Sequence, residues 1–422
     1  MKSCTARRRF IFGLFVLAVV LFFGPGAYSA GAQESRGDYL TIKIAVIGPG
    51  DELYFWWGHL GLLIEDRLSG ERRFYDYGVF TFSGDDFISN FAFGRLWYTT
   101  TVSNADDIIF RYINDNRSVI LYELNLSAEQ KLKLYNLTER DIKPENRNYL
   151  YNHFTDNCVT RILNNLNTVL NGTFYEAAEA TPGRLTLRGH VRRHTVAHPV
   201  WDWILNFLMG QVIDRPITAR EEMFLPSEVG RFIETFNYPD SHGRPTQLVS
   251  SVEDVYFSSR PPVPELPWNN IPLTLTVGMF LAVFFIFISA MARTSRDLSS
   301  RLFGAGNVIL GLIFGVIGSI LFFMTFFTNH DYTFENSNVL FANPLLLIAI
   351  PCGITMALCG QSEKRRKSAL ILRVLWAYVF FACLLSVIIK LSPSYYQNNL
   401  FVLTVFIPVS CVLGILRFKQ RN

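Results

Sequence analysis

The chain has 422 residues, half of them hydrophobic, with 37 phenylalanines and a formal net charge of +4 at pH 7. So large an apolar fraction exceeds what a soluble core needs and predicts membrane-spanning segments. The basic residues gather beside the apolar segments, so the small positive charge gives no reason to expect a nucleic-acid partner.

Residues 1–32 have the pattern of a secretory signal peptide. The segment starts with basic residues, continues as an apolar run from Phe10 to Phe23 and ends in small residues at 30–32. An uncleaved signal anchor is the alternative, although the apolar run is shorter than the ~20 residues of a spanning helix. Either segment would export the chain from residue 33 onward. No cysteine stands after the small residues, where a lipoprotein leader would place one.

Residues 33–259 have ordinary globular character and predict one extracytoplasmic domain. Alternation of apolar and polar residues favours strands, which we place at 40–47, 55–65, 72–77, 96–102 and 118–124. The turn at 66–70 joins the second and third strands as a hairpin. Short connections between most strands indicate a mainly antiparallel sheet.

Helices come after the strands. Ser127 is a natural N-cap for one helix, and another opens near Asp156 or Asn157 with apolar residues at helical spacing. Residues 188–230 are also helical in pattern. A Pro-rich stretch at 260–270 then reads as a semi-stiff linker to the membrane.

Five apolar segments complete the chain and predict an all-α transmembrane domain over 271–416, with a tail at 417–422. We place the segments at 271–292, 303–327, 339–359, 369–389 and 400–416. Lys and Arg follow the first, third and fifth segments, whereas the other loops have almost none. The positive-inside rule therefore puts the basic loops in the cytoplasm and the globular domain outside.

Cys158 is the one cysteine that lies outside a leader or apolar segment. An unpaired thiol in an exported domain indicates a reactive site or an intermolecular bridge. Its place in the first turn of a helix favours the thiolate, because free backbone amides and the helix dipole stabilise negative charge there.

A cysteine nucleophile needs a base and a group that orients the base. We assign His59, on the predicted hairpin, as the base, and Asp76 or Tyr77 on the return strand as the orienting group. His153 is a competing base but equally fits a structural role. Helix-start amides, helped by Asn157 or Arg161, would meet the transient oxyanion.

Three histidines recur every four residues, at His190, His194 and His198. A helix would align them, but Pro199 interrupts it and no carboxylate or cysteine completes a usual ligand set. We therefore predict no metal site and no cofactor.

The motifs resemble a known family. Gly58-His59 on an early strand and Asn157-Cys158 at the start of a later helix are similar to the circularly permuted papain-like fold of NlpC-type and lecithin:retinol acyltransferase (LRAT) enzymes. Residues 77–82, 151–161, 201–210 and 224–226 resemble the periplasmic domain of Lnb-type bacterial lipoprotein N-acyltransferases, and the spans from Ile271 onward resemble that family's transmembrane domain. One position departs: Val159 stands where a smaller or polar residue is expected.

The resemblance implies an α+β papain-like domain followed by five transmembrane helices in the bacterial inner membrane. It also implies acyl transfer through a Cys158 thioester, from a membrane phospholipid to the N-terminal amine of a diacylated lipoprotein, and it slightly favours Tyr77 over Asp76. The polar loop with His330, Asn336 and Asn338 faces the same side and is expected to touch lipid headgroups, or to be an ordinary polar loop.

Two alternatives remain. The same thiol and base would serve a membrane-tethered NlpC-like amidase or peptidase acting on cell-wall peptide. An inactive papain-like module would instead be a membrane-anchored binding protein.

Overall fold

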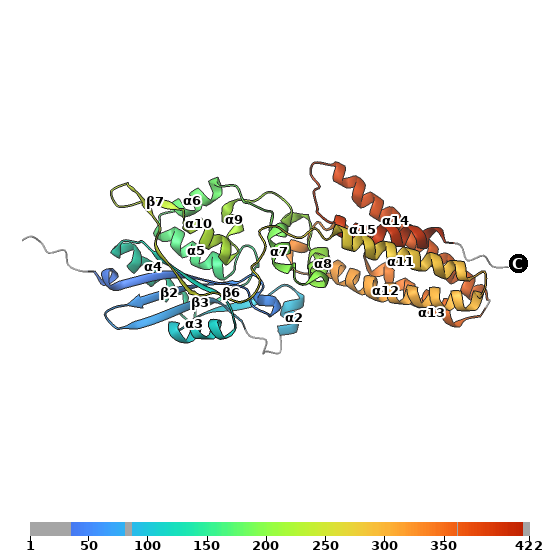
Figure 1. Cartoon of the computed structure of the whole chain (residues 1–422), viewed down its shortest axis with the longest axis horizontal. Coiled ribbons are helices and arrows are strands. Elements are labelled where there is room, and N and C mark those ends of the chain that lie inside the picture. Colours follow the sequence, from blue (N-terminus) through green and yellow to red (C-terminus); the bar gives the residue numbers. More distant parts are fainter. Residues whose placement is uncertain (1–34, 81–86, 361, 417–422) are drawn as a thin grey trace, which may run out of the picture.

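The computed structural model describes residues 35–80, 87–360 and 362–416. The predicted signal segment and the basic tail lie outside these ranges. A mixed α+β unit comes first and a bundle of long helices comes second, arranged end to end (Figure 1). The predicted order of an α+β domain and an all-α transmembrane domain is confirmed.

A seven-stranded antiparallel sheet forms the centre of the α+β unit. Its order is β6-β4-β3-β2-β1-β5-β9. The strands are β1 (Leu40–Ile47), β2 (His59–Asp66), β3 (Glu71–Val79), β4 (Trp97–Asn104), β5 (Val119–Leu124), β6 (Asn148–Leu150) and β9 (Val249–Tyr256). Two further strands, β7 (Asn237–Pro239) and β8 (Pro245–Gln247), form a separate hairpin.

The five predicted strands are all present, but β6 and β9 were missed. β6 has three residues, too few to show a period. β9 pairs only with β5 at the edge of the sheet, and its middle residues are exposed. An edge strand that is exposed to solvent on both faces has no alternation of apolar and polar residues, so its sequence resembles that of a loop.

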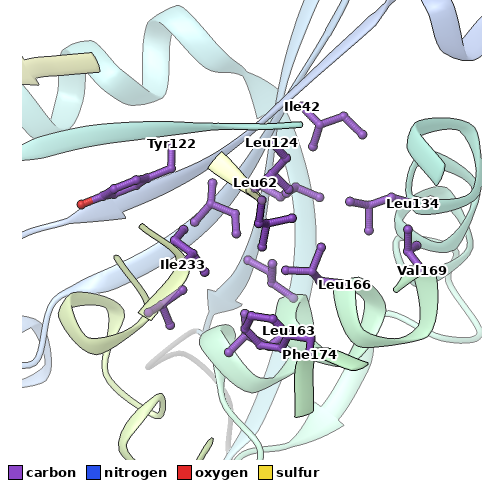
Figure 2. Packing of buried hydrophobic residues seen from close by; sticks show 14 of the residues in the cluster. Ile42, Leu62, Tyr122, Leu124, Leu134, Leu163, Leu166, Val169, Phe174 and Ile233 are labelled. Atoms are coloured by element: carbon purple, nitrogen blue, oxygen red, sulfur yellow. The ribbon is translucent and has the colours of Figure 1, made fainter. Parts of the chain in front are cut away.

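Helices cover both faces of the sheet. Helices α4 (Ala128–Asp141), α5 (Cys158–Val169), α6 (Thr173–Ala180) and α10 (Pro226–Ile233) pack on one face, and α3 (Ala105–Asn114) packs on the other. Figure 2 shows Leu62 of β2 against Leu163 and Leu166 of α5 in the larger core. Val159 is buried in this core, which explains the apolar residue at that position.

The region 188–230 is broken into several short helices. They are α7 (Leu187–Thr195), α8 (Pro199–Leu208), α9 (Ala219–Glu222) and α10. Pro199 is the first residue of α8, where its missing amide costs no hydrogen bond. The remaining short elements are α2 (Phe87–Ala92) and the 3-10 turns η1 (Arg36–Tyr39), η2 (Leu53–Phe55) and η3 (Gln211–Ile213).

Five helices form the membrane domain over the described residues from 271 onward. They are α11 (Ile271–Met291), α12 (Arg296–Phe327), α13 (Ala349–Leu358), α14 (Glu363–Ile388) and α15 (Leu400–Ile415). Turns η4 (Asp331–Thr333), η5 (Ser337–Leu340) and η6 (Pro344–Ile348) join α12 to α13, and η7 (Ile389–Leu391) ends α14. In the described part of the chain, 4 stretches are long and apolar enough to cross a membrane, and α15 is shorter.

The two units are joined by polar contacts as well as by the chain. Phe207 of α8 packs into the core of the helical bundle. Its carbonyl accepts hydrogen bonds from Asn336 (3.0 Å) and Asn338 (2.9 Å). Gln397 donates to Met209 O at 3.1 Å and to Asn336 Oδ1 at 2.8 Å. Through Gln397, the loop before α15 is bonded both to the α+β unit and to the loop that follows α12.

The segment 260–270 is not a free tether in this structure. Arg260 contacts Asp51, Glu265 pairs with Arg184, and Asn270 donates to Asp202 Oδ2 at 2.7 Å. These contacts run along the surface of the α+β unit. They hold its orientation relative to α11.

We expect Gln397→Met to weaken the joint between the units. The change keeps the volume but removes the donor to Met209 O and the acceptor for the Ser337 amide. Leaving buried polar groups unsatisfied costs about 1–3 kcal/mol each. Thermal unfolding of the protein in detergent micelles should show a lower midpoint, whereas Asn398→Met, at the exposed neighbour, should leave it unchanged.

Candidate active site

Cys158 is the first residue of α5 and is half-buried against the larger core. Asn157 caps the helix, since its Oδ1 accepts from the amides of Val159 (2.9 Å) and Thr160 (3.0 Å). The amide of Cys158 has no hydrogen-bond partner among the described residues. The helix therefore begins as predicted and leaves one free N–H beside the thiol.

His59 opens strand β2, and two glycines make its position possible. Gly58 has φ +77°, and a Cβ there would lie 2.7 Å from the carbonyl oxygen of Ile47. Across the hairpin, a Cβ at Gly78 would lie 2.6 Å from His59 Cε1. The chain can turn into β2 and seat an imidazole there because neither glycine has a side chain.

Asp76 is the partner of His59. Nε2 of His59 lies 3.0 Å from Oδ1 of Asp76, and the two side chains are 12% and 19% exposed. The ring N–H is not aligned for a hydrogen bond, so the contact is an ion pair. The amide of Gly78 donates to the same Oδ1 at 2.7 Å and fixes the carboxylate.

Tyr77 lies on the other face of β3, because side chains alternate along a strand. Its hydroxyl donates to Asp141 of α4 at 3.0 Å and accepts from Asn165 of α5 at 3.3 Å. The structure therefore places Asp76, and not Tyr77, beside His59. Tyr77 supports the packing of α4 and α5 on the sheet.

The charges around His59 favour its protonated form. Burial lowers the pKa of the imidazole, but the negative charges of Asp76 and of a Cys158 thiolate raise it well above its usual range. Burial raises the pKa of Asp76, but His59, the Gly78 amide and Arg117 outweigh it, so that pKa is lowered. Since Nε2 faces Asp76, Nδ1 is the ring nitrogen that remains for another partner.

No hydrogen bond joins Cys158 to His59 among the described residues. The thiolate is nevertheless close enough for its charge to act on the imidazole. Catalytic hydrogen bonds are often long before substrate binds and tighten in the complex. Proton exchange between the two groups would require substrate binding to bring the thiol and the imidazole within hydrogen-bonding reach.

The two side chains expected to assist the oxyanion are occupied. Asn157 donates both amide hydrogens, to His153 O (2.8 Å) and Phe224 O (3.1 Å). Arg161 pairs with both oxygens of Asp156, at 2.6 and 2.7 Å. Both residues hold the loop before α5, which leaves the amide of Cys158 as the group there without a partner among the described residues.

His153 is structural rather than a base. Burial lowers its pKa to about 4. Its ring stacks edge-on against Trp57 and Phe224, and Nδ1 is 3.2 Å from the Tyr151 hydroxyl. No carboxylate among the described residues orients it, in contrast to His59.

Comparison with models of known protein families identifies the family of this chain. Residues 29–192 match the model of the Lnb N-terminal periplasmic domain, and residues 269–421 match that of the Lnb transmembrane domain. The chain belongs to the Lnb family. No curated protein and no solved structure gives a significant match. The family models support a multi-pass membrane protein with a periplasmic domain.

Sequence reasoning missed two groups beside the Lnb site. Tyr98 of β4 stacks on Tyr151 with ring centroids 4.2 Å apart, and its hydroxyl has no hydrogen-bond partner among the described residues. Burial and the charge of Cys158 raise the pKa of Tyr98, so it stays a donor. Arg117 is 1% exposed, lies over the rings of Phe55 and Tyr112, and lowers the pKa of Asp76. Only the folded sheet brings them to the thiol.

The outward loop of the Lnb transmembrane domain meets the cysteine loop. Asn152 donates to Asp331 Oδ2 at 3.0 Å, and the rings of Phe154 and Tyr332 are 6.1 Å apart. His330 is buried and its Nδ1 is 2.8 Å from the Thr328 hydroxyl. Asn336 and Asn338 are used in the joint to α8. In this structure these three residues thus have structural contacts, and Asp331 contacts the loop that leads to Cys158.

The three histidines at four-residue spacing do not converge. His190 Nε2 is 2.7 Å from Glu222, His194 Nδ1 is 2.8 Å from the Trp56 carbonyl, and the His198 ring stacks on the Trp56 ring. Among the described residues no group of three His, Cys, Asp or Glu side chains could hold a metal ion.

We expect Gly78→Ala to displace His59 and to lower activity at least 10-fold, because the new Cβ would overlap the imidazole. The rate of Cys158 alkylation by iodoacetamide and the turnover of an ester should both change. Gly360→Ala is the control, since its Cβ meets no atom within 4 Å. Full activity in Gly78→Ala would show that His59 does not need this position.

The protonation of His59 can be measured directly. Hydrogen exchange at histidine carbons, followed by mass spectrometry, should give His59 a midpoint above the usual range of a histidine, because the pKa of His59 is raised. In Asp76→Asn the midpoint should fall, because burial then outweighs the remaining charge. The ion pair stabilises the fold fully below about pH 6.5 and loses this effect as pH rises through the raised pKa. Equal midpoints in wild type and Asp76→Asn would contradict the pairing.

Proposed function

We propose that the protein is a lipoprotein N-acyltransferase. It moves a fatty acyl chain from a membrane phospholipid, through a thioester on Cys158, to the N-terminal amine of a diacylglyceryl-cysteine lipoprotein. Membership in the Lnb family supports a lipoprotein-processing enzyme. The proposal also includes the papain-like character of the α+β unit and its place on the outer face of the bacterial inner membrane.

The observation that carries the proposal is the position of the thiol relative to the membrane domain. The loop that ends at Cys158 contacts the outward loop of the bundle through Asn152 and Phe154. This contact supports a nucleophile at the end of the α+β unit that is next to the spanning helices. A lipid ester and the amine of a membrane-anchored lipoprotein are both present at that level.

In the first half-reaction the Cys158 thiolate attacks the carbonyl carbon of a phospholipid ester. The Cys158 amide and the Tyr98 hydroxyl are the donors available for the oxyanion. As the intermediate collapses, protonated His59 gives its Nδ1 proton to the departing alkoxide. A lysophospholipid leaves and the acyl group stays on sulfur as a thioester.

In the second half-reaction the lipoprotein amine attacks the thioester carbonyl. Neutral His59 takes the proton that the amine loses, and the amide forms as the thiolate departs. Asp76 holds the imidazole and stabilises its charge in both steps. The site thus returns to the thiolate and imidazolium with which it began.

We expect Cys158→Ala to abolish N-acylation in cells. Mass spectrometry of lipoprotein N-terminal peptides should find a free amine in the mutant and an acylated amine in wild type. His59→Gln should lose at least 100-fold in rate, because a general base contributes about 10²–10⁴. Tyr77→Phe should retain most activity, because its hydroxyl bonds to Asp141 rather than to the site.

A labelled phospholipid separates this proposal from its rivals. Acyl label on wild-type protein that hydroxylamine releases, and that Cys158→Ala lacks, is the expected thioester. Release of wall-peptide fragments without any acyl label would favour the amidase. Unchanged N-acylation in Cys158→Ala would leave a non-catalytic binding module.

A further inference from the structure

Three aromatic side chains stand out from the α+β unit near its membrane end. Phe91 belongs to α2, and Phe93 and Trp97 lie in the connection from α2 to the start of β4. Phe91 is 56% and Trp97 60% exposed, and Phe93 is also exposed. Arg95 stands between them and is exposed as well. We call Phe91, Phe93 and Trp97 the aromatic rim.

The aromatic rim is tied to the end of a membrane-spanning helix. The amide of Asn329 donates to the Phe93 carbonyl at 3.0 Å, and the rings of Phe93 and Phe323 are 5.6 Å apart. Gly94 has φ +71°, and a Cβ there would lie 3.0 Å from the His330 amide nitrogen. The turn at Gly94 therefore packs closely against the residues that follow α12. Helix α12 thus fixes the position of the aromatic rim along the axis of the bundle.

The end of α12 has the composition of a membrane interface. Phe326 and Phe327, its last residues, are exposed apolar rings beside Phe323. Such rings face lipid in a spanning helix, and aromatic residues concentrate where the hydrocarbon core meets the headgroups. The aromatic rim continues this surface onto the α+β unit, with Arg95 placed to meet phosphate groups.

The same stretch leads to the thiol. Tyr98 follows Trp97 and stacks on Tyr151. Burial and the charge of Cys158 raise the pKa of Tyr98. On the other side of Tyr98, the ring of Phe80 lies 4.9 Å away. Side chains alternate along a strand, so Trp97 and Tyr98 point to opposite faces of β4, and the aromatic rim is joined to the stacked tyrosines through the start of this strand.

We propose that the aromatic rim inserts into the outer leaflet and forms the entry by which a lipid acyl ester reaches Cys158. The partner of the aromatic rim is a lipid surface, because the rim is continuous with the lipid-facing end of α12. Insertion does not depend on the acyl transfer proposed above, whereas the entry role does. The two parts are tested separately.

Insertion is tested by fluorescence in proteoliposomes made from phosphatidylethanolamine and phosphatidylglycerol. The full-length protein has 7 tryptophans, and brominated acyl chains quench those in contact with lipid tails. Trp97→Phe should reduce the quenched part of the emission relative to wild type. As a control, Leu68→Trp adds a tryptophan at the turn between β2 and β3, the far end of the sheet, and should add only unquenched emission. An unchanged quenched part in Trp97→Phe would overturn insertion.

The entry role is tested with two substrates. The double variant Phe91→Ser/Trp97→Ser should slow thioester formation from bilayer phospholipid at least 10-fold. It should leave acylation of Cys158 by a water-soluble short-chain thioester within 2-fold of wild type, since that substrate needs no entry from lipid. Leu68→Ser, at a residue 62% exposed, removes an apolar side chain away from the membrane and should match wild type on both substrates.

Equal loss on both substrates, or no loss on either, would overturn the entry role. If wild type itself forms no thioester from any phospholipid, the acyltransferase proposal fails instead, and the quenching result still decides insertion. The two failures are therefore distinguishable.

Discussion

The contact between His59 and Asp76 is the constraint around which the site is built. A charged imidazole that is largely withdrawn from water needs a fixed counter-charge, or burial would neutralise it. Several features serve this contact. Gly58 lets the chain enter β2, Gly78 leaves room for the ring, and the Gly78 amide holds the carboxylate. Arg117, buried behind them, adds a second cation that keeps Asp76 ionised. The result is a buried row of three groups of alternating charge, Arg117, Asp76 and His59.

The second level of organisation is the joint between the sheet unit and the helical bundle. Carbonyls at the end of α8 accept hydrogen bonds from Asn336 and Asn338, and Gln397 links these loops to Met209. The segment 260–270 is held along the same side. Polar residues between apolar spans are often assigned to substrate binding, but here the buried asparagines satisfy backbone groups that would otherwise be unpaired. This joint fixes the position of the cysteine loop relative to the spanning helices.

Helix α5 shows how one residue serves two purposes. Asn157 uses Oδ1 to cap the helix and Nδ2 to bind the carbonyls of His153 and Phe224. The donors and the acceptor of the Asn157 side chain are therefore all in hydrogen bonds. The backbone amide of Cys158 has no partner among the described residues. The neighbouring Arg161 is likewise held by Asp156. The conspicuous polar side chains near Cys158 thus hold its loop, while the backbone N–H of Cys158 and the hydroxyl of Tyr98 have no hydrogen-bond partner among the described residues.

The sequence by itself determined the α+β unit followed by spanning helices, the start of α5 and the hairpin that carries His59, and it singled out the Cys158 thiol as the candidate reactive group. These features come from local patterns: apolar periodicity, capping residues, loop charge and a cysteine in an unusual place. It missed β9, because an edge strand exposed on both faces has no alternation to detect. Only the tertiary structure decided between Asp76 and Tyr77, since that choice depends on which face of β3 looks toward the ring. It alone brought Tyr98, Arg117 and Asp331 to the site, because contacts between residues far apart in the chain leave no periodic signal in the sequence.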